Sequence, residues 1–251
     1  MKIKEAIILA GGRGTRLGEI TRNKPKPMID INSKPFLEYV LDYLKDEGIS
    51  KVILAVGYKH EIIKNYFGNN FKGIKLIYSI EEKPLGTGGA LKLAGNFIDD
   101  TIFSVLNGDT LFKVSLDKLY SFHILKKAKI TVALKIQDNC YRYGKVELDM
   151  HGQIITFSEK GIKERGLING GIYILNFDVI EKINSGMFLS FEKDILPDYI
   201  NKGLFGLPFN SYFIDIGVPL DYYRAIKELN DETRSYKYST TYNYKRFFSG
   251  E

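Results

Sequence analysis

Short apolar runs alternate with helix-like spacing along the first half of the chain. Residues 6–10, 51–56 and 102–106 form apolar runs typical of strands buried on both faces of a sheet. Between the first two runs, apolar side chains recur at helical spacing, at Phe36, Leu37, Val40, Leu41 and Leu44. Pro35 suits the first turn of this helix, and Gly48 suits its end. Strands separated by helices predict right-handed crossovers, and hence an α/β fold with a Rossmann-like, mostly parallel twisted sheet flanked by helices.

The second half of the chain has strand candidates close together and few helices between them. The candidates are residues 130–134, 143–148, 154–157 and 167–175, and they predict a mixed sheet. A helix over 219–229 is expected to close the fold. We therefore predict one domain over 1–230, with halves over about 1–128 and 129–230. Residues 231–251 are polar and tyrosine-rich, which fits either a partly ordered tail or a strap in a homo-oligomer.

Composition narrows the class of protein. In 251 residues, 44% hydrophobic and 13% aromatic content exclude general disorder. One cysteine, Cys140, rules out an intramolecular disulfide framework, and with only three histidines it argues against a Cys/His zinc site. No apolar run approaches the roughly 20 residues of a membrane helix, and the amino terminus lacks a signal pattern. We expect a cytoplasmic protein with no membrane partner.

The formal net charge of +6 raises the question of a nucleic-acid partner. Lysine and arginine are interleaved with aspartate and glutamate instead of gathering in a block or stripe. This pattern favours a phosphate-handling enzyme with a solvated basic surface over a nucleic-acid-binding module.

A glycine-rich loop with basic side chains follows the first apolar run. It reads Gly11-Gly12-Arg13-Gly14-Thr15-Arg16-Leu17, and Lys24-Pro25-Lys26-Pro27-Met28 comes a few residues later. Glycines let backbone N–H groups approach an anion closely, and the basic side chains supply positive charge. Leu17 stands where a dinucleotide-binding fingerprint needs glycine, and no Gly-Lys-Ser/Thr follows as in a P-loop. A glycine pair alone fits an ordinary turn, but the added charges favour a phosphate site.

Five segments in order resemble the sugar-1-phosphate nucleotidyltransferase family. They are residues 9–17 with 24–28, 84–90, 107–109, 159–160 with 169–173, and 213–219. The match covers roughly residues 4 to 230 and implies a GT-A-like nucleotidyltransferase fold whose mixed-sheet part binds the sugar. Within the family, the short chain and the run 166–173 are most similar to the D-glycero-D-manno-heptose 1-phosphate guanylyltransferases.

The resemblance implies a reaction. A nucleotidyl group passes from an NTP, with GTP favoured, to a sugar 1-phosphate, with D-glycero-D-manno-heptose 1-phosphate favoured, and pyrophosphate leaves. The product would serve surface-polysaccharide synthesis. Because a sugar phosphate is already a nucleophile at neutral pH, catalysis rests on positioning and charge neutralisation. The alternatives are a hexose 1-phosphate with GTP, UTP, CTP or dTTP, and a non-catalytic nucleotide-sugar-binding regulatory subunit.

The resemblance also implies roles for particular residues. Lys26, Arg16 and Asp109 are the implied catalytic residues, and Asp109 and Asp215 the implied ligands of Mg²⁺. The implied nucleotide-binding residues are Leu9, Ala10, Gly11, Gly12, Arg13, Gly14, Thr15, Arg16, Lys26, Gly86, Thr87, Gly88, Asn107 and Gly108. The implied sugar-phosphate-binding residues are Tyr143, Gly144, Glu159, Lys160, Asn169 and Gly170.

Each segment also has a plainer interpretation by itself. Asn107-Gly108-Asp109 is a common turn, and Lys26 fits a surface lysine in a loop that Pro25 and Pro27 hold extended. The glycines of 86–90 fit a tight helix start as well as a wall for the nucleobase. Glu159-Lys160 with Asn169-Gly170-Gly171 fits a surface ion pair and a β-turn or bulge, and Gly170 also fits close approach of a bulky sugar.

Overall fold

The computed structural model describes residues 3–12, 14–158, 161 and 163–229 of the chain. The strands are β1 (Glu5–Leu9), β2 (Asp30–Ile31), β3 (Lys34–Pro35), β4 (Lys51–Val56), β5 (Asn70–Phe71), β6 (Ile74–Ile80), β7 (Ile102–Asn107), β8 (Thr110–Phe112), β9 (Ile130–Gln137), β10 (Lys145–Leu148), β11 (Ile154–Phe157), β12 (Gly166–Asn176), β13 (Leu204–Phe209) and β14 (Phe213–Asp215). The helices are α1 (Phe36–Asp46), α2 (His60–Phe67), α3 (Gly86–Gly95), α4 (Leu116–Leu125), α5 (Phe177–Glu181) and α6 (Pro219–Glu228). Short 3₁₀ turns lie at Thr15–Thr21, Lys26–Met28 and Leu196–Tyr199, and a π turn lies at Phe191–Ile195.

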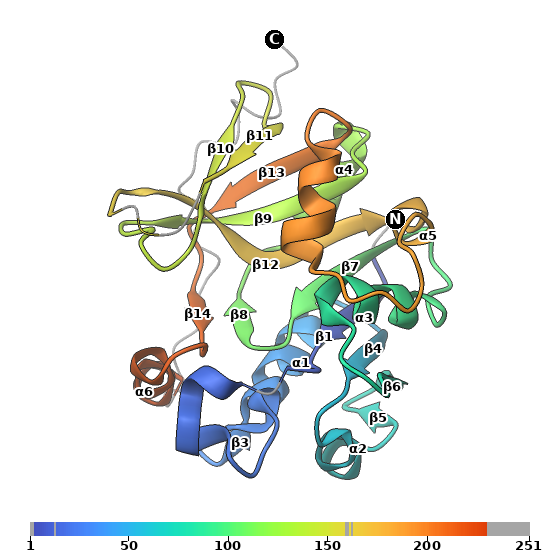
Figure 1. The fold of residues 1–251 in the computed structure, drawn as a ribbon, viewed down its shortest axis with the longest axis vertical. Coiled ribbons are helices and arrows are strands. Elements are labelled where there is room, and N and C mark those ends of the chain that lie inside the picture. Colours follow the sequence, from blue (N-terminus) through green and yellow to red (C-terminus); the bar gives the residue numbers. More distant parts are fainter. Residues whose placement is uncertain (1–2, 13, 159–160, 162, 230–251) are drawn as a thin grey trace.

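One large mixed sheet organises the molecule (Figure 1). Its strand order is β11-β10-β12-β7-β1-β4-β6-β5, with β9 paired to β12 and β13 paired to β9. The strands β7, β1, β4 and β6 are parallel to one another. The direction reverses at β12, which is antiparallel to both β7 and β9. The predicted α/β fold, with a mostly parallel sheet and a mixed part in the second half, is confirmed.

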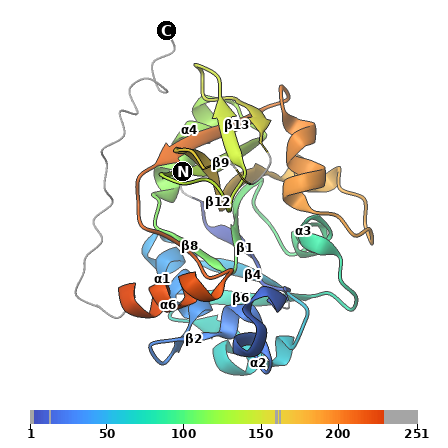
Figure 2. The ribbon, with the colours of Figure 1, turned by 60° about the vertical axis from the view of Figure 1, so that its left-hand side comes forward.

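The central strands are apolar throughout because helices cover both faces of the sheet. In β1, Ile8 belongs to a buried cluster that includes residues of α1, α2 and α4, whereas Ile7 belongs to a second cluster that includes residues of α3 and α5. Figure 2 shows α1 and α3 on opposite sides of β1 and β4. The unbroken apolar runs seen in the sequence therefore arise from burial on two faces. The carboxyl ends of the parallel strands remain uncovered by these two layers, and ligands bind at such edges in α/β folds.

The first helix follows its predicted spacing closely. Phe36, Leu37, Val40, Leu41 and Leu44 are all fully buried. Pro35 precedes α1 at its N-cap and does not lie inside the first turn, whereas Gly48 ends the helix in the left-handed conformation at φ 83°. Glycine suits that position because the left-handed region is costly for residues with a Cβ atom.

Two features of the second half bear on the site. The run Asn169-Gly170-Gly171 lies inside the long strand β12, where the register against β9 shifts between Asn169 and Tyr173. It is therefore a bulge and does not precede a separate strand. β14 pairs antiparallel with β8 in a separate two-stranded sheet, with Asp215 opposite Thr110.

The described helices include none with both the length and the apolar character of a membrane span. The division of the domain near residue 128 and the cytoplasmic location stay predictions.

Candidate active site

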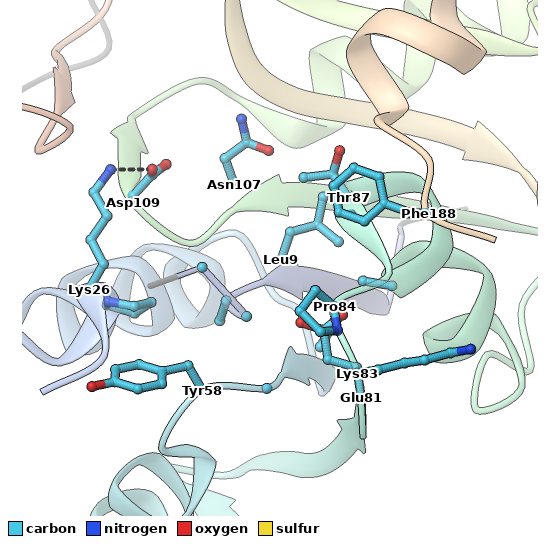
Figure 3. A pocket seen from close by; sticks show the side chains of 18 of the residues that line it. Leu9, Lys26, Tyr58, Glu81, Lys83, Pro84, Thr87, Asn107, Asp109 and Phe188 are labelled. Carbon is cyan, nitrogen blue, oxygen red and sulfur yellow. Dashed lines mark hydrogen bonds and ion pairs between the residues drawn. The ribbon is translucent and has the colours of Figure 1, made fainter. Parts of the chain in front are cut away.

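A cavity of about 660 Å³ opens at the carboxyl ends of β1, β4, β6 and β7. Its volume is typical of sites that hold a molecule the size of a nucleotide. The lining residues are Leu9, Ala10, Gly11, Gly12, Arg16, Lys26, Pro27, Ala55, Gly57, Tyr58, Glu81, Glu82, Lys83, Pro84, Gly86, Thr87, Ala90, Asn107, Asp109, Phe188 and Glu192. In Figure 3, Lys26 and Asp109 lie at one end of the cavity, and Glu81, Lys83 and Pro84 lie at the other. The site therefore has two chemically different ends.

Lys26 and Asp109 define the charged end of the cavity. The Lys26 side chain is 10% exposed, and its ammonium group is paired with the Asp109 carboxylate. Pro25 is extended at φ −64° and ψ 148°, as predicted, but Lys26–Met28 then forms a 3₁₀ turn. Because this turn buries the lysine stem, the ammonium group is directed to the end of β7. A lysine held in this way can neutralise charge on a phosphate.

Gly11 and Gly12 form a backbone wall between the two ends of the cavity, with Gly11 against the Glu81 side chain. A Cβ atom added at Gly12 would meet no atom of the described residues within 4 Å, so the backbone there is open to them. Gly14, at φ 69°, lies against the side chains of Lys26 and Thr21. Gly14 and Thr15 do not line the cavity, whereas Arg16 does. The loop thus presents backbone at two glycines and uses the third to seat Lys26.

Asp109 lies in the turn between β7 and β8, and Asp215, at the end of β14, lies close to it. Asp215 ends β14 opposite Thr110, and the Ile216 N–H donates to the Asp109 carbonyl at 3.0 Å. Burial first, and then the negative charge of Asp109, raises the pKa of the Asp215 carboxyl, while Lys26 and Arg142 act in the opposite direction. Two carboxylates this close are unfavourable for the fold alone unless a cation compensates them.

The two carboxylates fit a hard divalent cation. Across the part of the chain that the structure describes, no group of three or more His, Cys, Asp or Glu side chains is placed to hold a metal ion. Asp109 and Asp215 therefore offer oxygen ligands and leave other positions for water or phosphate oxygens, an arrangement that suits Mg²⁺.

Glu81 provides an acceptor at the opposite end of the cavity. One of its oxygens accepts the Leu85 N–H at 3.1 Å, and the other lies against the backbone of Gly11 and Gly57. Burial raises the pKa of this carboxyl, and the Leu85 N–H partly opposes the shift. Asn107 also lines the cavity, but its Oδ1 is buried and has no hydrogen-bond partner among the described residues. A ligand with N–H or O–H donors can satisfy the Glu81 carboxylate.

The second glycine-rich segment packs against the protein itself. A Cβ atom at Gly86 would lie 2.4 Å from the Leu189 carbonyl oxygen, and one at Gly89 would lie 2.5 Å from that of Met187. The Gly88 N–H donates to the Leu189 carbonyl at 2.7 Å. The glycines of α3 thus admit the segment 187–189, whereas the sequence led us to expect a flat base against them. Gly86 and Thr87 still line the cavity, but Gly88 does not.

The same packing places Phe188 at the rim of the cavity. Thr87 fixes this segment, since its hydroxyl accepts the Phe191 N–H at 2.8 Å and donates to Glu192 at 2.9 Å. Phe188 itself is 71% exposed and lines the cavity on the side of Thr87 and Pro84 (Figure 3).

Several predicted residues lie elsewhere. Gly108 is buried beside the Leu9 carbonyl, to which its N–H donates at 2.9 Å. Gly170 is buried against the Phe112 ring, where an added Cβ would come within 2.5 Å, so packing alone accounts for glycine there. Asn169 binds within its own strand, to the Gly171 N–H and the Tyr173 hydroxyl.

The sugar-side residues that remain among the described ones, Tyr143 and Gly144, do not line this cavity. Tyr143 packs edge-on against Phe213 at 5.9 Å, and Gly144 lies against the Ser158 carbonyl. Arg13, Glu159 and Lys160 lie outside the described residues. Their predicted roles, and the sugar-phosphate role of the others, stay predictions.

Some residues that line the cavity were not predicted from the sequence, although they follow strands of the parallel sheet. Gly57 and Tyr58 follow β4, and Glu81 to Lys83 follow β6. The rule that ligands bind beyond the carboxyl ends of parallel strands applies to these strands as it does to β1 and β7. Phe188 and Glu192 had no such signal, because the packing of 187–189 on α3 is a long-range contact.

Comparison with known proteins now identifies the family. The nucleotidyl transferase family matches residues 5–232 of this chain. The chain belongs to that family. The D-glycero-alpha-D-manno-heptose 1-phosphate guanylyltransferase of Aneurinibacillus thermoaerophilus is 47% identical over 226 residues, which cover 90% of this chain and 98% of the relative. The enzyme of the same name from Campylobacter jejuni is 49% identical over 222 residues, covering 88% and 98%.

A solved structure agrees with this assignment. HddC from Yersinia pseudotuberculosis, complexed with GMP-PN, superposes on this nucleotidyl transferase with a TM-score of 0.81 at 37% identity. The match covers 90% of this chain and all of HddC. Nucleotidyl transferases of this family commonly use Mg²⁺.

Proposed function

We propose that this nucleotidyl transferase moves the guanylyl group of GTP to D-glycero-α-D-manno-heptose 1-phosphate, giving GDP-heptose and pyrophosphate. The observation that carries the proposal is the match, at 47% and 49% identity over about nine-tenths of the chain, to two guanylyltransferases named for that sugar phosphate. The cavity supports it, because a charged end and a carboxylate acceptor lie apart in one site.

Glu81 supports GTP over the other nucleotides. Guanine presents two adjacent donors, N1–H and the N2 amino group, on its base-pairing edge, whereas uracil and thymine present one N–H between two carbonyls. A carboxylate accepts both guanine donors, but it faces lone pairs on the other bases. The side chain lies at the end of the cavity away from Lys26, where a base belongs when the triphosphate occupies the charged end.

Mg²⁺ is the proposed cofactor, held by Asp109 and Asp215. When bound, the ion would supply charge stabilisation at the phosphates and link them to the two carboxylates. The ion would also oppose the rise in the pKa of Asp215, which burial causes first and the negative charge of Asp109 second.

The basic residues have proposed roles on the triphosphate. Lys26 neutralises charge that develops at the α-phosphate, and Arg16 binds the leaving pyrophosphate from the exposed side of the loop. The N–H groups of Gly11 and Gly12 hold phosphate oxygens. A sugar-phosphate oxygen then attacks the α-phosphorus in line, and no protein nucleophile is needed.

A substrate screen tests the proposal. Purified protein is incubated with Mg²⁺, each of GTP, ATP, CTP and UTP, and each of heptose, mannose and glucose 1-phosphate, and pyrophosphate release is followed. We expect GTP with heptose 1-phosphate to give the highest kcat/KM, and mass spectrometry to find GDP-heptose. Preference for a hexose 1-phosphate would contradict the sugar assignment, and preference for another NTP would contradict the assignment of Glu81. Absence of pyrophosphate release with every pair would favour a non-catalytic protein.

A further inference from the structure

A buried carboxylate on α6 lies behind the proposed metal site. Asp221 is 4% exposed, and its two oxygens face two arginines. Oδ2 accepts a hydrogen bond from Arg142, and Oδ1 lies 3.1 Å from Nη1 of Arg224. A carboxylate buried to this extent is tolerated because both oxygens are paired with cations. The buried Asp221 carboxylate thus holds the side chains of Arg142 and Arg224 in place.

Arg142 connects this carboxylate to Asp215. Its Nη2 lies 3.8 Å from Oδ2 of Asp215, while Nη1 is bound to Asp221. Its guanidinium lies over the Tyr143 ring at 5.2 Å, and that ring packs against Phe213 of β14. The side chain is 35% exposed, so a long, mobile arginine has a defined position only because these partners hold it.

The two oxygens of Asp215 have different partners. Oδ1 accepts the Gly217 N–H at 2.7 Å, whereas Oδ2 faces Arg142. Asp109 has a matching arrangement, in which Lys26 is the cation beside the carboxylate. Each proposed metal ligand therefore has its own cation. Lys26 is held by the turn in which it lies, but Arg142 is held by Asp221.

The helix that carries Asp221 is itself fixed to the segment after Lys26. The Tyr222 hydroxyl donates to the Asp30 carbonyl at 3.4 Å, and the Asn32 side chain donates to the Ile226 carbonyl at 2.8 Å. α6 is therefore attached to the β2–β3 segment and, through Arg224 and the Phe213 carbonyl, to β14. Asp221 is a firm anchor because its helix is attached on both sides.

We propose that Asp221 is a positioning residue for nucleotidyl transfer, which holds Arg142 against Asp215 and so sets the direction in which the Asp215 carboxylate meets the metal ion. This inference rests on the proposed function, because it takes Asp215 as a metal ligand. Partners that orient a metal ligand commonly contribute one to two orders of magnitude to metal affinity.

Metal binding, measured apart from turnover, tests the inference. Mn²⁺ is titrated into the protein in the presence of the α,β-methylene analogue of GTP, and free Mn²⁺ is followed by electron paramagnetic resonance. We expect Asp221→Asn and Arg142→Gln each to raise the Mn²⁺ dissociation constant about tenfold. Because both act through one contact, the double variant should bind no more weakly than Arg142→Gln alone.

Glu228→Gln is the matched control, since it removes an ion pair of the same helix, the 3.4 Å contact with Nε of Arg224, and leaves Asp221, Arg142 and the hydrogen bond from Arg224 to Phe213 in place. Its Mn²⁺ dissociation constant should stay within about twofold of the wild type, whatever its thermal stability. An equal loss in Glu228→Gln and Asp221→Asn would show a general structural effect and overturn the inference.

Three further outcomes are decisive. Wild-type affinity in Asp221→Asn or in Arg142→Gln overturns the positioning role, as does a double variant whose loss is the sum of the two. If Asp221→Asn does not fold, the Mn²⁺ affinity of Arg142→Gln still tests the positioning role, because Arg142 is partly exposed and its substitution is better tolerated. A wild-type protein that binds no Mn²⁺ with the analogue would overturn the proposed function itself.

Discussion

The two glycine-rich segments look alike in the sequence but differ in what their glycines touch. In the first segment, an added Cβ atom at Gly12 would meet none of the described residues within 4 Å, whereas one at Gly11 or Gly14 would meet the side chain of Glu81 or of Lys26. In the second segment, Gly86 and Gly89 face the backbone of 187–189 at distances where no Cβ atom fits. The first segment therefore leaves Gly12 free for a ligand and packs its other glycines against side chains of the site, while the second segment packs against the backbone of another part of the chain.

This difference separates residues that serve the ligand from residues that serve packing. On the ligand side, burial and then the charge of Asp109 raise the pKa of Asp215, and Oδ1 of Asn107 has no hydrogen-bond partner within the described part of the chain. On the packing side, the N–H of Gly88 and the hydroxyl of Thr87 have partners within the protein. Substitutions on the two sides should therefore affect activity and stability in different proportions.

The largest effect on activity is expected at the two carboxylates. Asp109→Asn or Asp215→Asn should lower kcat about a thousandfold, because the metal ion loses a charged ligand. The raised pKa of Asp215 means that the fold disfavours its ionised form at neutral pH, so Asp215→Asn should not lower the melting temperature. Steady-state kinetics and calorimetry check both statements. Near-normal turnover in the two variants would refute the metal assignment.

Gly12→Ala should give the next largest loss, and again without a loss of stability. The new methyl group meets none of the residues that the structure describes within 4 Å, but it occupies the surface where phosphate is proposed to lie. Displacement of the phosphates by about 1 Å lowers kcat/KM about a hundredfold. The measurement is kcat/KM for GTP beside the melting temperature. An unchanged kcat/KM in Gly12→Ala would show that Gly12 does not lie against the bound nucleotide.

Gly89→Ala should show the opposite balance. Its Cβ would lie 2.5 Å from the Met187 carbonyl oxygen, so the backbone of 187–189 must move. We expect a loss of about 1–3 kcal/mol in the free energy of unfolding, measured with urea, and a smaller change in kcat/KM of the folded protein. If Gly89→Ala and Gly12→Ala lose activity and stability in the same ratio, the comparison between the segments is wrong.

Glu81→Gln should have the smallest effect of the four, confined to GTP. The amide offers one acceptor where the carboxylate offers two, so kcat/KM with GTP should fall about tenfold, and the preference for GTP over UTP should narrow by the same factor. Competition assays with the two nucleotides measure this ratio directly. An equal loss for both nucleotides would place Glu81 in a structural role.

The sequence was sufficient for much of the fold because the decisive patterns are local. The two-face burial of β1 and β4 and the spacing of α1 depend on short-range periodicity, and the structure follows them. The same holds for the cavity residues that immediately follow β1 and β7. Ligands also bind beyond the carboxyl ends of β4 and β6, where Tyr58 and Glu81 lie, but these two residues were not predicted.

Long-range contacts account for what the sequence could not predict. Nothing near Gly88 or Gly170 in the chain indicates that Leu189 or Phe112 will pack on them. Asp221 reads as a surface residue of an amphipathic helix, and only the fold brings Arg142 to it from 79 residues away. The roles of Gly88, Gly170 and Asp221 can be recognised only in the folded structure, because their partners are distant in the sequence.

One measurement tests the central claim most directly: a crystal structure with the α,β-methylene analogue of GTP and Mn²⁺, using the anomalous signal of the metal. The account predicts the triphosphate in the cavity, with oxygens at the N–H groups of Gly11 and Gly12, guanine at Glu81, and an anomalous peak that both Asp109 and Asp215 ligate. A triphosphate bound outside this cavity, or a metal ion that contacts neither carboxylate, would contradict it.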